Sequence, residues 1–234
     1  MLINNSLELG TCPASWKIAK VTPLFKGGEE TSCDNNRPIS VLPAPSKVIE
    51  KVVNSQLQQY ANRTGLISKD QYAYAKNTST TTALIKVTDD WRKAIENGRK
   101  VVSTFIDLRK AFDIIDHSTL LSKLERAGFQ YLELDWFKSY LSERQQSVAI
   151  KDVISDKMKL THGVPQGSVL GPTLFNIHIN GITTSCDNDG HPFTLYADDT
   201  EFHVSDTCLD IAENTMNTCF DKITVIQCRS KALL

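Results

Sequence analysis

Three aspartates have the residue type and spacing of a metal-binding site. Asp198 and Asp199 are adjacent, and two β-rich runs bracket them at the spacing of a hairpin. Because neighbouring negative charges repel, a folded chain tolerates such a pair most readily in water or beside a multivalent cation. Asp107 lies in a mostly apolar run, 101–108, that predicts a buried strand. If this strand and the hairpin are neighbours in one sheet, Asp107 and Asp198 could share an ion such as Mg²⁺, which prefers carboxylate oxygens.

The remaining sequence predicts the elements that must position these acids. Pro23 places the short strand 19–26 at the edge of a sheet, and Ser46 and Ser118 are expected to open helices. Strands and helices alternate irregularly, without the βα repeat of a doubly wound sheet. The sequence therefore predicts an α+β fold with helices on one face of a largely antiparallel sheet. Further helices are predicted at 79–96, 132–141, 169–179 and from about Asp206, and strands at 147–160, 193–196 and 200–204.

Composition limits the class of protein. The chain has 234 residues, of which 41% are hydrophobic and 23% charged, near the averages of soluble globular domains. These values exclude a wholly disordered chain, and no apolar run approaches the roughly 18–20 residues of a membrane helix. The N-terminus lacks the pattern of a secretory signal. The six cysteines include no Cys-x-x-Cys pair, so they predict free thiols and an intracellular location, in the nucleus or the cytoplasm.

Charge is distributed unevenly along the chain. Residues 1–110 hold 16 Lys and Arg against 10 Asp and Glu, whereas residues 111–234 hold 10 against 17. One half could therefore face phosphates while the other collects cations. Chance variation among solvated surface charges is the alternative explanation.

Four segments in this order resemble the motifs of reverse transcriptases. Residues 196–199, Tyr-Ala-Asp-Asp, resemble the metal-binding hairpin of that family, and 105–113 resemble its first metal motif. Residues 163–172 resemble the loop that positions template and nucleotide. Residues 37–42, followed by 47–51, are similar to the fingers signature of the non-LTR (LINE-type) retrotransposon branch. The chain thus resembles an RNA-directed DNA polymerase domain of that branch, truncated before the thumb.

The resemblance implies a polymerase fingers–palm fold with a largely antiparallel palm sheet backed by helices. Fingers-like segments are expected at 1–98 and 114–158, palm segments at 99–113 and 159–227, and a truncated tail at 228–234. The thumb is expected to be absent. Since a thumb grips the primer–template duplex through phosphate contacts, which dominate affinity for nucleic acid, its absence predicts weak duplex binding.

The same resemblance implies a reaction and its metal ligands. The family adds deoxynucleotides to a primer 3′-OH, copying RNA, by two-metal-ion phosphoryl transfer that releases pyrophosphate. Asp107, Asp198 and Asp199 are the implied catalytic and metal-binding carboxylates, and the backbone carbonyl of Leu108 is an additional implied ligand. The implied cofactors are two Mg²⁺ ions, with Mn²⁺ as an alternative. The implied partners are an RNA template with primer DNA and deoxynucleoside triphosphates, without a membrane.

Five residues are implied to bind the incoming nucleotide. Lys26 and Arg37 match fingers positions that contact the triphosphate, as expected for cations on phosphate. Phe112 matches an aromatic gate whose flat ring leaves no room for a sugar 2′-hydroxyl. Gln166 and Gly167 lie in the nucleotide-positioning loop. The alternatives are two solvated surface charges, a core phenylalanine and an ordinary tight turn.

Tyr74, Lys76 and Pro165 are implied to bind the template. The segment that contains Tyr74 and Lys76 departs from the family at two positions. Ala73 stands where Gly is usual, and Ala75 stands where Arg is usual, which should weaken phosphate contacts.

Two other classes of function remain open. Gly181 stands where the family usually has Asp. This departure, the one at Ala75 and the missing thumb favour a catalytically inactive remnant that acts as an RNA- or protein-binding module. Metal-dependent RNA binding without nucleotide incorporation would identify this module. A generic α+β domain, in which the Asp pair is only a turn, is the third possibility. It predicts that Mg²⁺ does not change thermal stability, since only a ligand that binds the folded state raises it.

Overall fold

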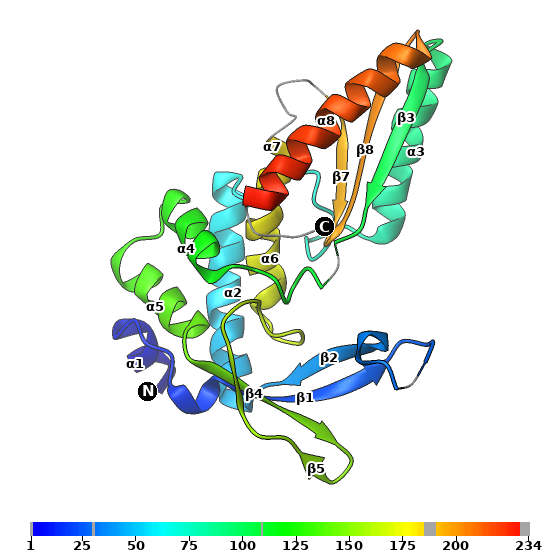
Figure 1. Ribbon diagram of the computed structural model, residues 1–234. Coiled ribbons are helices and arrows are strands. Elements are labelled where there is room, and N and C mark those ends of the chain that lie inside the picture. The colour runs from blue at the N-terminus through cyan, green and yellow to red at the C-terminus, as the bar shows by residue number, and fades with distance from the viewer. Residues whose placement is uncertain (1, 30, 109, 185–190, 230–234) are drawn as a thin grey trace. The chain divides into compact units, whose positions relative to one another are not determined.

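The computed structural model describes residues 2–29, 31–108, 110–184 and 191–229 (Figure 1). The chain forms two compact units, each built from two stretches of sequence. The first unit comprises Met1–Tyr60 and Phe112–Leu174, and the second comprises Ala61–Ala111 and Phe175–Leu234. The fingers and palm boundaries remain a prediction, because compactness alone does not identify polymerase subdomains. Arg109 of the first metal motif and residues 230–234 of the expected tail lie outside the described residues.

The first unit combines a small sheet with helices. Its strands follow the order β2-β1-β4-β5, with β6 also paired to β4. The pairing of β1 with β4 is parallel and the other pairings are antiparallel. The α-helices and strands are α1 (Leu2–Glu8), β1 (Ile18–Phe25), β2 (Asn36–Val41), α2 (Ala44–Thr64, whose last residues belong to the second unit), α4 (His117–Arg126), α5 (Tyr131–Leu141), β4 (Arg144–Ile150), β5 (Val153–Ile154), β6 (Met158–Leu160) and the start of α6 (Gly171–Ile179).

The environment of Pro23 corrects one prediction. Strand β1 lies between β2 and β4, so it is not an edge strand along its whole length. Its pairing with β4 ends at Val21, and Pro23 pairs only with Pro38 of β2. The missing N–H of proline is therefore tolerated because that part of the strand has a neighbour on one side only.

Two predicted helix starts are wrong for a physical reason. Helix α2 begins at Ala44, and the hydroxyl of Ser46 donates to Glu50 in the interior instead of capping the helix. Helix α4 begins at His117, because the carboxylate of Asp116 accepts from the backbone N–H of Thr119 and takes the capping position. The helix predicted at 79–96 is present, and Ser79 caps its start.

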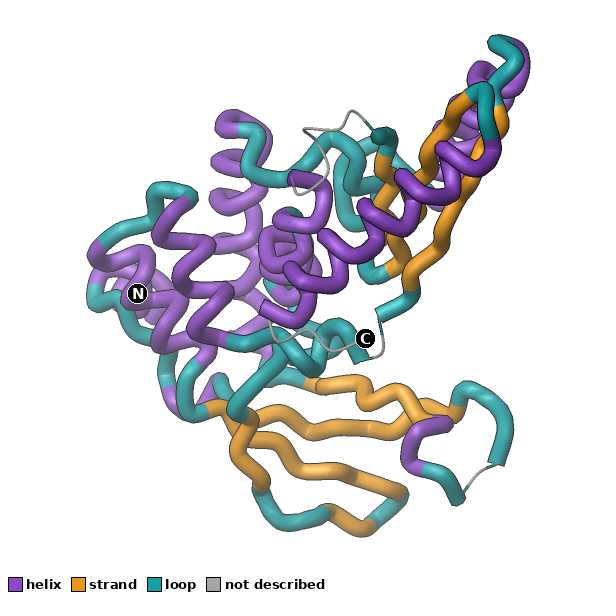
Figure 2. The backbone as a smooth tube through the Cα atoms, turned by 45° about the horizontal axis from the view of Figure 1, so that its top comes forward, coloured by secondary structure: helices purple, strands orange, loops and turns teal. Residues whose placement is uncertain are grey.

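The second unit is organised around an antiparallel three-stranded sheet. Strand β8 (Asp199–Asp206) lies between β3 (Lys100–Ile106) and β7 (Phe193–Tyr196) (Figure 1). Figure 2 draws the strands of this sheet in orange. The segment 70–72 extends the sheet beyond β7, through a bridge between Gln71 and Leu195. The helices of this unit are α3 (Thr80–Glu96), α7 (Gly181–Thr184), α8 (Leu209–Arg229) and the end of α6. The predicted largely antiparallel sheet backed by helices is confirmed.

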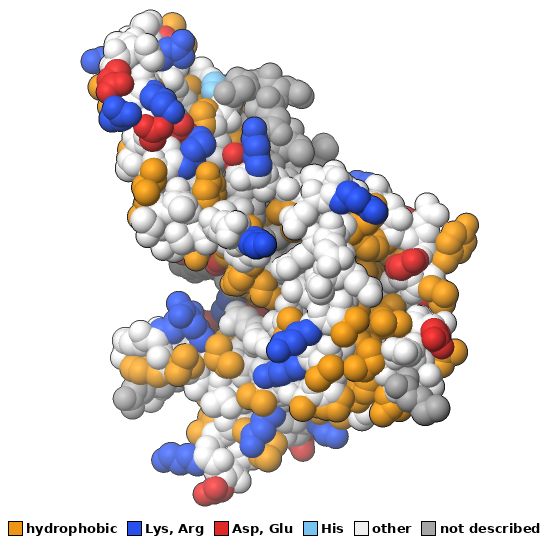
Figure 3. Space-filling view, turned by 180° about the vertical axis from the view of Figure 1, so that it is seen from behind, with side chains coloured by type: hydrophobic (Ala, Val, Ile, Leu, Met, Phe, Trp, Pro, Cys, Tyr) orange, Lys and Arg blue, Asp and Glu red, His pale blue; other side chains and the backbone are white. Residues whose placement is uncertain are grey.

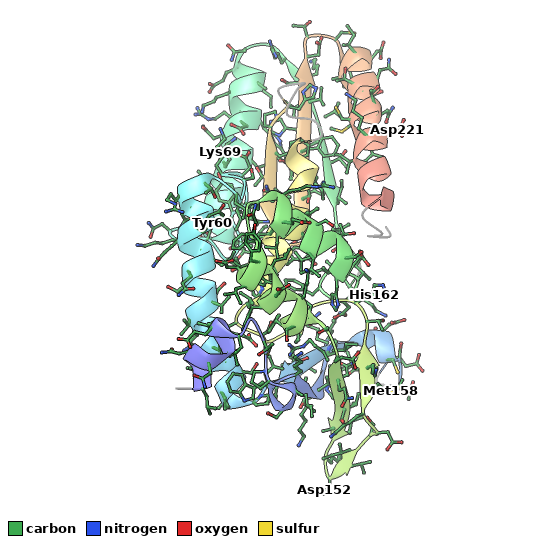
Figure 4. The ribbon with its side chains drawn as sticks, turned by 90° about the vertical axis from the view of Figure 1, so that its left-hand side faces the viewer. Tyr60, Lys69, Asp152, Met158, His162 and Asp221 are labelled. Carbon is green, nitrogen blue, oxygen red and sulfur yellow. The ribbon has the colours of Figure 1, made fainter. Side chains whose placement is uncertain are left out.

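Helices cover both faces of this sheet. On one face, Trp91 of α3 makes an edge contact with the ring of Phe105. On the other, the hydroxyl of Thr104 contacts the sulfur of Met216 on α8. Because successive strand residues point to opposite faces, α3 and α8 must lie on opposite sides of β3, as Figure 4 shows. The expectation of helices on a single face is therefore wrong for this unit.

The surface of α3 carries a ladder of ion pairs. Arg92 and Lys93 both pair with Asp89, and Arg92 also pairs with Glu96. Acidic and basic side chains are interleaved over this part of the surface (Figure 3). Such exposed pairs contribute little to stability, so the face is a solvated one.

Within the described part of the chain, Cys12, Cys33, Cys208 and Cys219 form no disulfide, as predicted. Cys186 and the side chain of Cys228 lie outside the described part. No helix within the described ranges has both the length and the apolar character needed to cross a membrane.

The capping box of α3 generates a prediction. The side chain of Ser79 accepts from the backbone of Thr82, and the side chain of Thr82 accepts from the backbone of Ser79. Ser79→Ala should lower the free energy of unfolding by about 1 kcal/mol, measured by denaturant titration. Thr88→Ala, on the exposed middle of the same helix, should be neutral or slightly stabilising because alanine has the higher helix propensity. Equal losses in both variants would contradict the role of the cap.

Candidate active site

A two-residue turn carries the acidic pair of the second unit. Strands β7 and β8 pair up to Tyr196 opposite Asp199, which leaves Ala197 and Asp198 to form the turn. Ala197 is buried and has a φ of 56°, a left-handed conformation that costs a non-glycine residue about 1–2 kcal/mol. Asp198 is half-buried, and Asp199 is exposed at the start of β8. The surrounding structure must therefore hold this turn in place.

The register of the sheet brings Asp107 to the same end. Ile106, the last residue of β3, pairs with Thr200 of β8, so the next position along the two strands sets Asp107 against Asp199. The pKa of Asp199 is raised, first by partial shielding of its carboxyl group from water and then by the negative charge of Asp107. Leu108 follows with its side chain buried. The predicted neighbourhood of the β3 end and the hairpin is therefore present.

Asp198 acts electrostatically on Tyr74, another residue of the second unit. Partial shielding of the Tyr74 phenol from water, followed by the negative charge of Asp198, raises the pKa of Tyr74. Among the described residues, no three His, Cys, Asp or Glu side chains form a ready-made metal cluster. The structure thus brings Asp107 close to Asp199, and the negative charge of Asp198 acts on Tyr74.

The donor set at this end of the sheet fits a hard divalent cation. The carboxylates of Asp107, Asp198 and Asp199 supply oxygen donors, which is the ligand type that Mg²⁺ prefers. In the described part of the chain, no basic side chain forms an ion pair with Asp107 or Asp199. A bound cation would relieve the repulsion that raises the pKa of Asp199.

The loop 163–170 belongs to the first unit and is packed through glycines. A Cβ on Gly163 would lie 2.7 Å from the carbonyl oxygen of Asp113, and one on Gly167 would lie 2.7 Å from that of Ser40. Both glycines have positive φ, 80° and 106°. The N–H of Ser40 donates to the carbonyl of Gln166 at 2.7 Å. The tight turn therefore requires glycine at both positions.

The residues of this loop that are predicted to bind nucleotide or template differ in their exposure to solvent. Pro165 is buried, Gln166 is half-buried and Gly167 is exposed. Phe112 is also half-buried, and its carbonyl accepts from the N–H of Val164 at 2.9 Å. Phe112 and the loop are thus held together by backbone hydrogen bonds within the first unit.

Glu50 anchors the end of this loop and has no role in the sequence analysis. It is fully buried, and its carboxylate accepts from the N–H groups of Val169 and Leu170 at 2.6 and 3.3 Å. These groups precede α6, so the negative charge lies at a helix N-terminus, where it is favourable. In the sequence, the only indication of a role for Glu50 is its position in the segment 47–51, which is similar to the fingers signature.

Lys26 and Arg37 lie on one face of the β1–β2 hairpin. Arg37 pairs with Leu24, and the N–H of Lys26 continues the ladder to the carbonyl of Asn35 at 2.9 Å. Residues two apart on a strand share a face, so Leu24, Lys26 and Arg37 point to the same side, together with Lys20. Both predicted cations are exposed, and neither forms an ion pair with a described residue.

Tyr74 and Lys76, the predicted template residues of the second unit, are exposed. Tyr74 has a φ of 58°, and the hydroxyl of Thr78 closes the turn by donating to the carbonyl of Tyr72 at 2.6 Å. Ala73 is buried and does not have a positive φ. The backbone therefore does not require the glycine that the family usually has there.

Comparison with known proteins identifies the family. The family model described as "Reverse transcriptase (RNA-dependent DNA polymerase)" matches residues 24–230. The chain belongs to the reverse transcriptase family. The RNA-directed DNA polymerase from the mobile element jockey of Drosophila melanogaster is 33% identical to this chain over 206 residues. These residues are 86% of this chain and 22% of the relative. The probable polymerase from transposon BS of the same species is 29% identical, over 91% of the chain and 24% of its own length.

Solved structures show the same fold. Telomerase from Candida tropicalis, in complex with a TWJ fragment of telomeric RNA, has a TM-score of 0.66 and 11% identity over 95% of this chain and 40% of its own. Apo telomerase from that species, truncated from its C-terminal domain, has a TM-score of 0.65 and 13% identity over 93% and 48%. The reverse transcriptase chain described here thus has a polymerase fold, and it spans about a quarter of the length of its retrotransposon relatives.

Gly167 in the loop 163–170 gives a test of the packing of that loop. Gly167→Ala must accept both a positive φ and a 2.7 Å contact with the Ser40 carbonyl, so it should lower the unfolding free energy by about 2 kcal/mol or more. Gly65→Ala also has a positive φ, 67°, but its new Cβ would meet no atom within 4 Å. Gly65→Ala should therefore lower the unfolding free energy by only about 1 kcal/mol. Equal losses in denaturant titrations would show that the contact with Ser40 has no effect.

His117 makes the stability of the loop depend on pH. Its Nε2 lies 2.7 Å from the carbonyl oxygen of Gly163, and removal of the ring from water lowers its pKa. In the unfolded chain the pKa is ordinary, about 6.5. As the pH falls through that value, the unfolded chain takes up its proton first, so stability is lost until the folded-state pKa is passed.

The variant His117→Gln should therefore lose less stability than wild type between about pH 7.5 and about pH 5. Denaturant unfolding at several pH values measures the difference. Identical pH profiles for the two proteins would contradict the lowered pKa of His117.

Proposed function

We propose that the chain is the nucleotidyl-transferring part of an RNA-directed DNA polymerase, which extends a DNA primer on an RNA template. The observation that supports this most strongly is the position of Asp107. A carboxylate that follows β3 meets the start of β8 at the tip of a Tyr-Ala-Asp-Asp hairpin, and it acts electrostatically on Asp199. Membership of the reverse transcriptase family supports the same reaction.

Asp107, Asp198 and Asp199 are proposed to hold two Mg²⁺ or Mn²⁺ ions, with the carbonyl of Leu108 as an additional oxygen donor. Bound there, divalent cations supply positive charge for activation of the primer 3′-hydroxyl and for the leaving pyrophosphate. Asp107 and Asp199 must both be ionised to bind, so the raised pKa of Asp199 makes protons compete with metal at acidic pH.

The first unit is proposed to bind the deoxynucleoside triphosphate. Lys26 and Arg37 share one exposed face, where their charges are available to phosphate oxygens. The flat ring of Phe112 is proposed to exclude a ribose 2′-hydroxyl, and Gln166 and Gly167 to contact the nucleotide. These roles are supported by the exposure of the cations and by the rigid backbone of the loop.

The RNA template is proposed to contact Tyr74, Lys76 and Pro165. The exposed ring of Tyr74 can stack on a base, and Lys76 can contact a phosphate. Pro165 is buried, so its contribution is to shape the loop rather than to present a large contact surface.

A second candidate function is an RNA-binding module without catalysis. The three cations Lys20, Lys26 and Arg37 on one hairpin face favour it, because they suffice for phosphate contacts without any metal.

Primer extension distinguishes the two candidates. With a short RNA template, deoxynucleotides and Mg²⁺ or Mn²⁺, Asp198→Asn should reduce extension at least about a hundredfold, because several kcal/mol of charge stabilisation are lost. Asp152→Asn is the matched control, since Asp152 lies exposed in the β4–β5 turn (Figure 4). Undiminished extension by Asp198→Asn would contradict the metal role. RNA binding without extension by the folded wild-type chain would favour the second candidate.

A further inference from the structure

The turn that carries Asp198 is held by a residue from outside the hairpin. The ladder between β7 and β8 ends at Tyr196 and Asp199, so it does not include the backbone N–H and carbonyl of Ala197. Ala197 is only 6% exposed, and buried backbone groups need hydrogen-bond partners. Its left-handed φ adds a further need for external support.

Gln71 supplies both partners. Its Oε1 accepts from the N–H of Ala197 at 3.1 Å, and its Nε2 donates to the carbonyl of Ala197 at 3.5 Å, the outer limit of a hydrogen bond. The same Oε1 accepts from the N–H of Ala73 at 2.9 Å. The side chain is 3% exposed. One buried amide thus acts on the turn as a neighbouring peptide group would.

The backbone around Gln71 fixes where this amide lies. The N–H of Leu195 donates to the carbonyl of Asp70, and the N–H of Tyr72 donates to the carbonyl of Leu195, both at 2.8 Å. The main chain on both sides of Gln71 is therefore paired with β7, two residues before Ala197. The amide continues this pairing past the end of the strand, onto the turn.

We propose that Gln71 is a positioning residue for the metal site: by fixing the peptide groups of Ala197, it places the Asp198 carboxylate for divalent cations. This inference rests on the proposed metal role of Asp198. Gln71 does not touch the metal or the substrate. Partners of metal-binding residues typically change metal affinity about 10–100-fold when removed.

The chain offers a matched control in Asn180. Its side-chain amide bridges the same stretch of chain, accepting from the N–H of Ser68 at 2.7 Å and donating to the carbonyl of Leu66 at 2.8 Å. None of these contacts involves the turn. Asn180→Ala therefore weakens the anchoring of the segment without removing a hydrogen bond from Ala197.

The experiment measures Mn²⁺ binding to the full chain by electron paramagnetic resonance, together with hydrogen exchange at the Ala197 amide. Gln71→Met conserves volume but removes both hydrogen-bonding groups. It should weaken Mn²⁺ affinity about tenfold and speed exchange at Ala197. Gln71→Asn keeps the amide on a shorter side chain, and it should show the same two changes. Asn180→Ala should keep its Mn²⁺ affinity within about twofold of wild type, since it leaves the partners of the metal-binding turn in place.

The outcomes separate this inference from the proposed function. Wild-type Mn²⁺ affinity in either folded Gln71 variant overturns the inference, as does an equal loss of affinity in Asn180→Ala. Asp198→Asn tests the site itself. If it also binds Mn²⁺ as wild type does, the proposed metal site is wrong and the positioning role falls with it. Loss of Mn²⁺ binding in Asp198→Asn with no change in the Gln71 variants leaves the site standing and rejects only Gln71.

Discussion

The antiparallel pairing of β3 with β8 decides where the acidic residues of this chain lie. Its register sets Ile106 opposite Thr200 and so brings the end of one strand to the start of the other. A slip by one residue would turn every side chain of β3 to the opposite face, exchanging the contact of Phe105 with α3 for that of Thr104 with α8. Packing on both faces therefore fixes the register, and the register imposes the closeness of Asp107 to Asp199.

Short-range patterns predicted much of the second unit. The strand at 101–108, the hairpin at 193–204 and the helix after Ser79 all depend on neighbours in sequence, and all three are present. The failures also have local causes. Ser46 and Ser118 lost the capping position because Glu50 attracts one hydroxyl and Asp116 provides a stronger acceptor beside the other. The expectation of a buried strand is wrong for β3. It lies at the edge of its sheet, and of its seven residues only Ile106 is buried.

The supporting residues of the site could not be predicted from the sequence, because their contacts join residues that are far apart along the chain. Gln71 reaches a turn 126 residues away, and Glu50 binds N–H groups 119 residues away. Neither side chain differs in local pattern from an exposed glutamine or glutamate, so only the tertiary fold assigns them a role. Asp107 could be predicted because carboxylates at adjacent strand ends carry a chemical signature of their own. The buried amide and carboxylate that support the loops carry none.

Alanine at position 197 also has a consequence for conformational entropy. Glycine would adopt the left-handed φ without strain, but it would also populate many other conformations. Alanine has fewer alternatives, so once its surroundings impose φ 56° the turn samples a narrower ensemble. Less freedom then remains to be lost when a ligand binds to Asp198. The strained backbone of this turn lowers the stability of the folded chain. In return, the oxygen donors of the turn are already in place before a ligand binds.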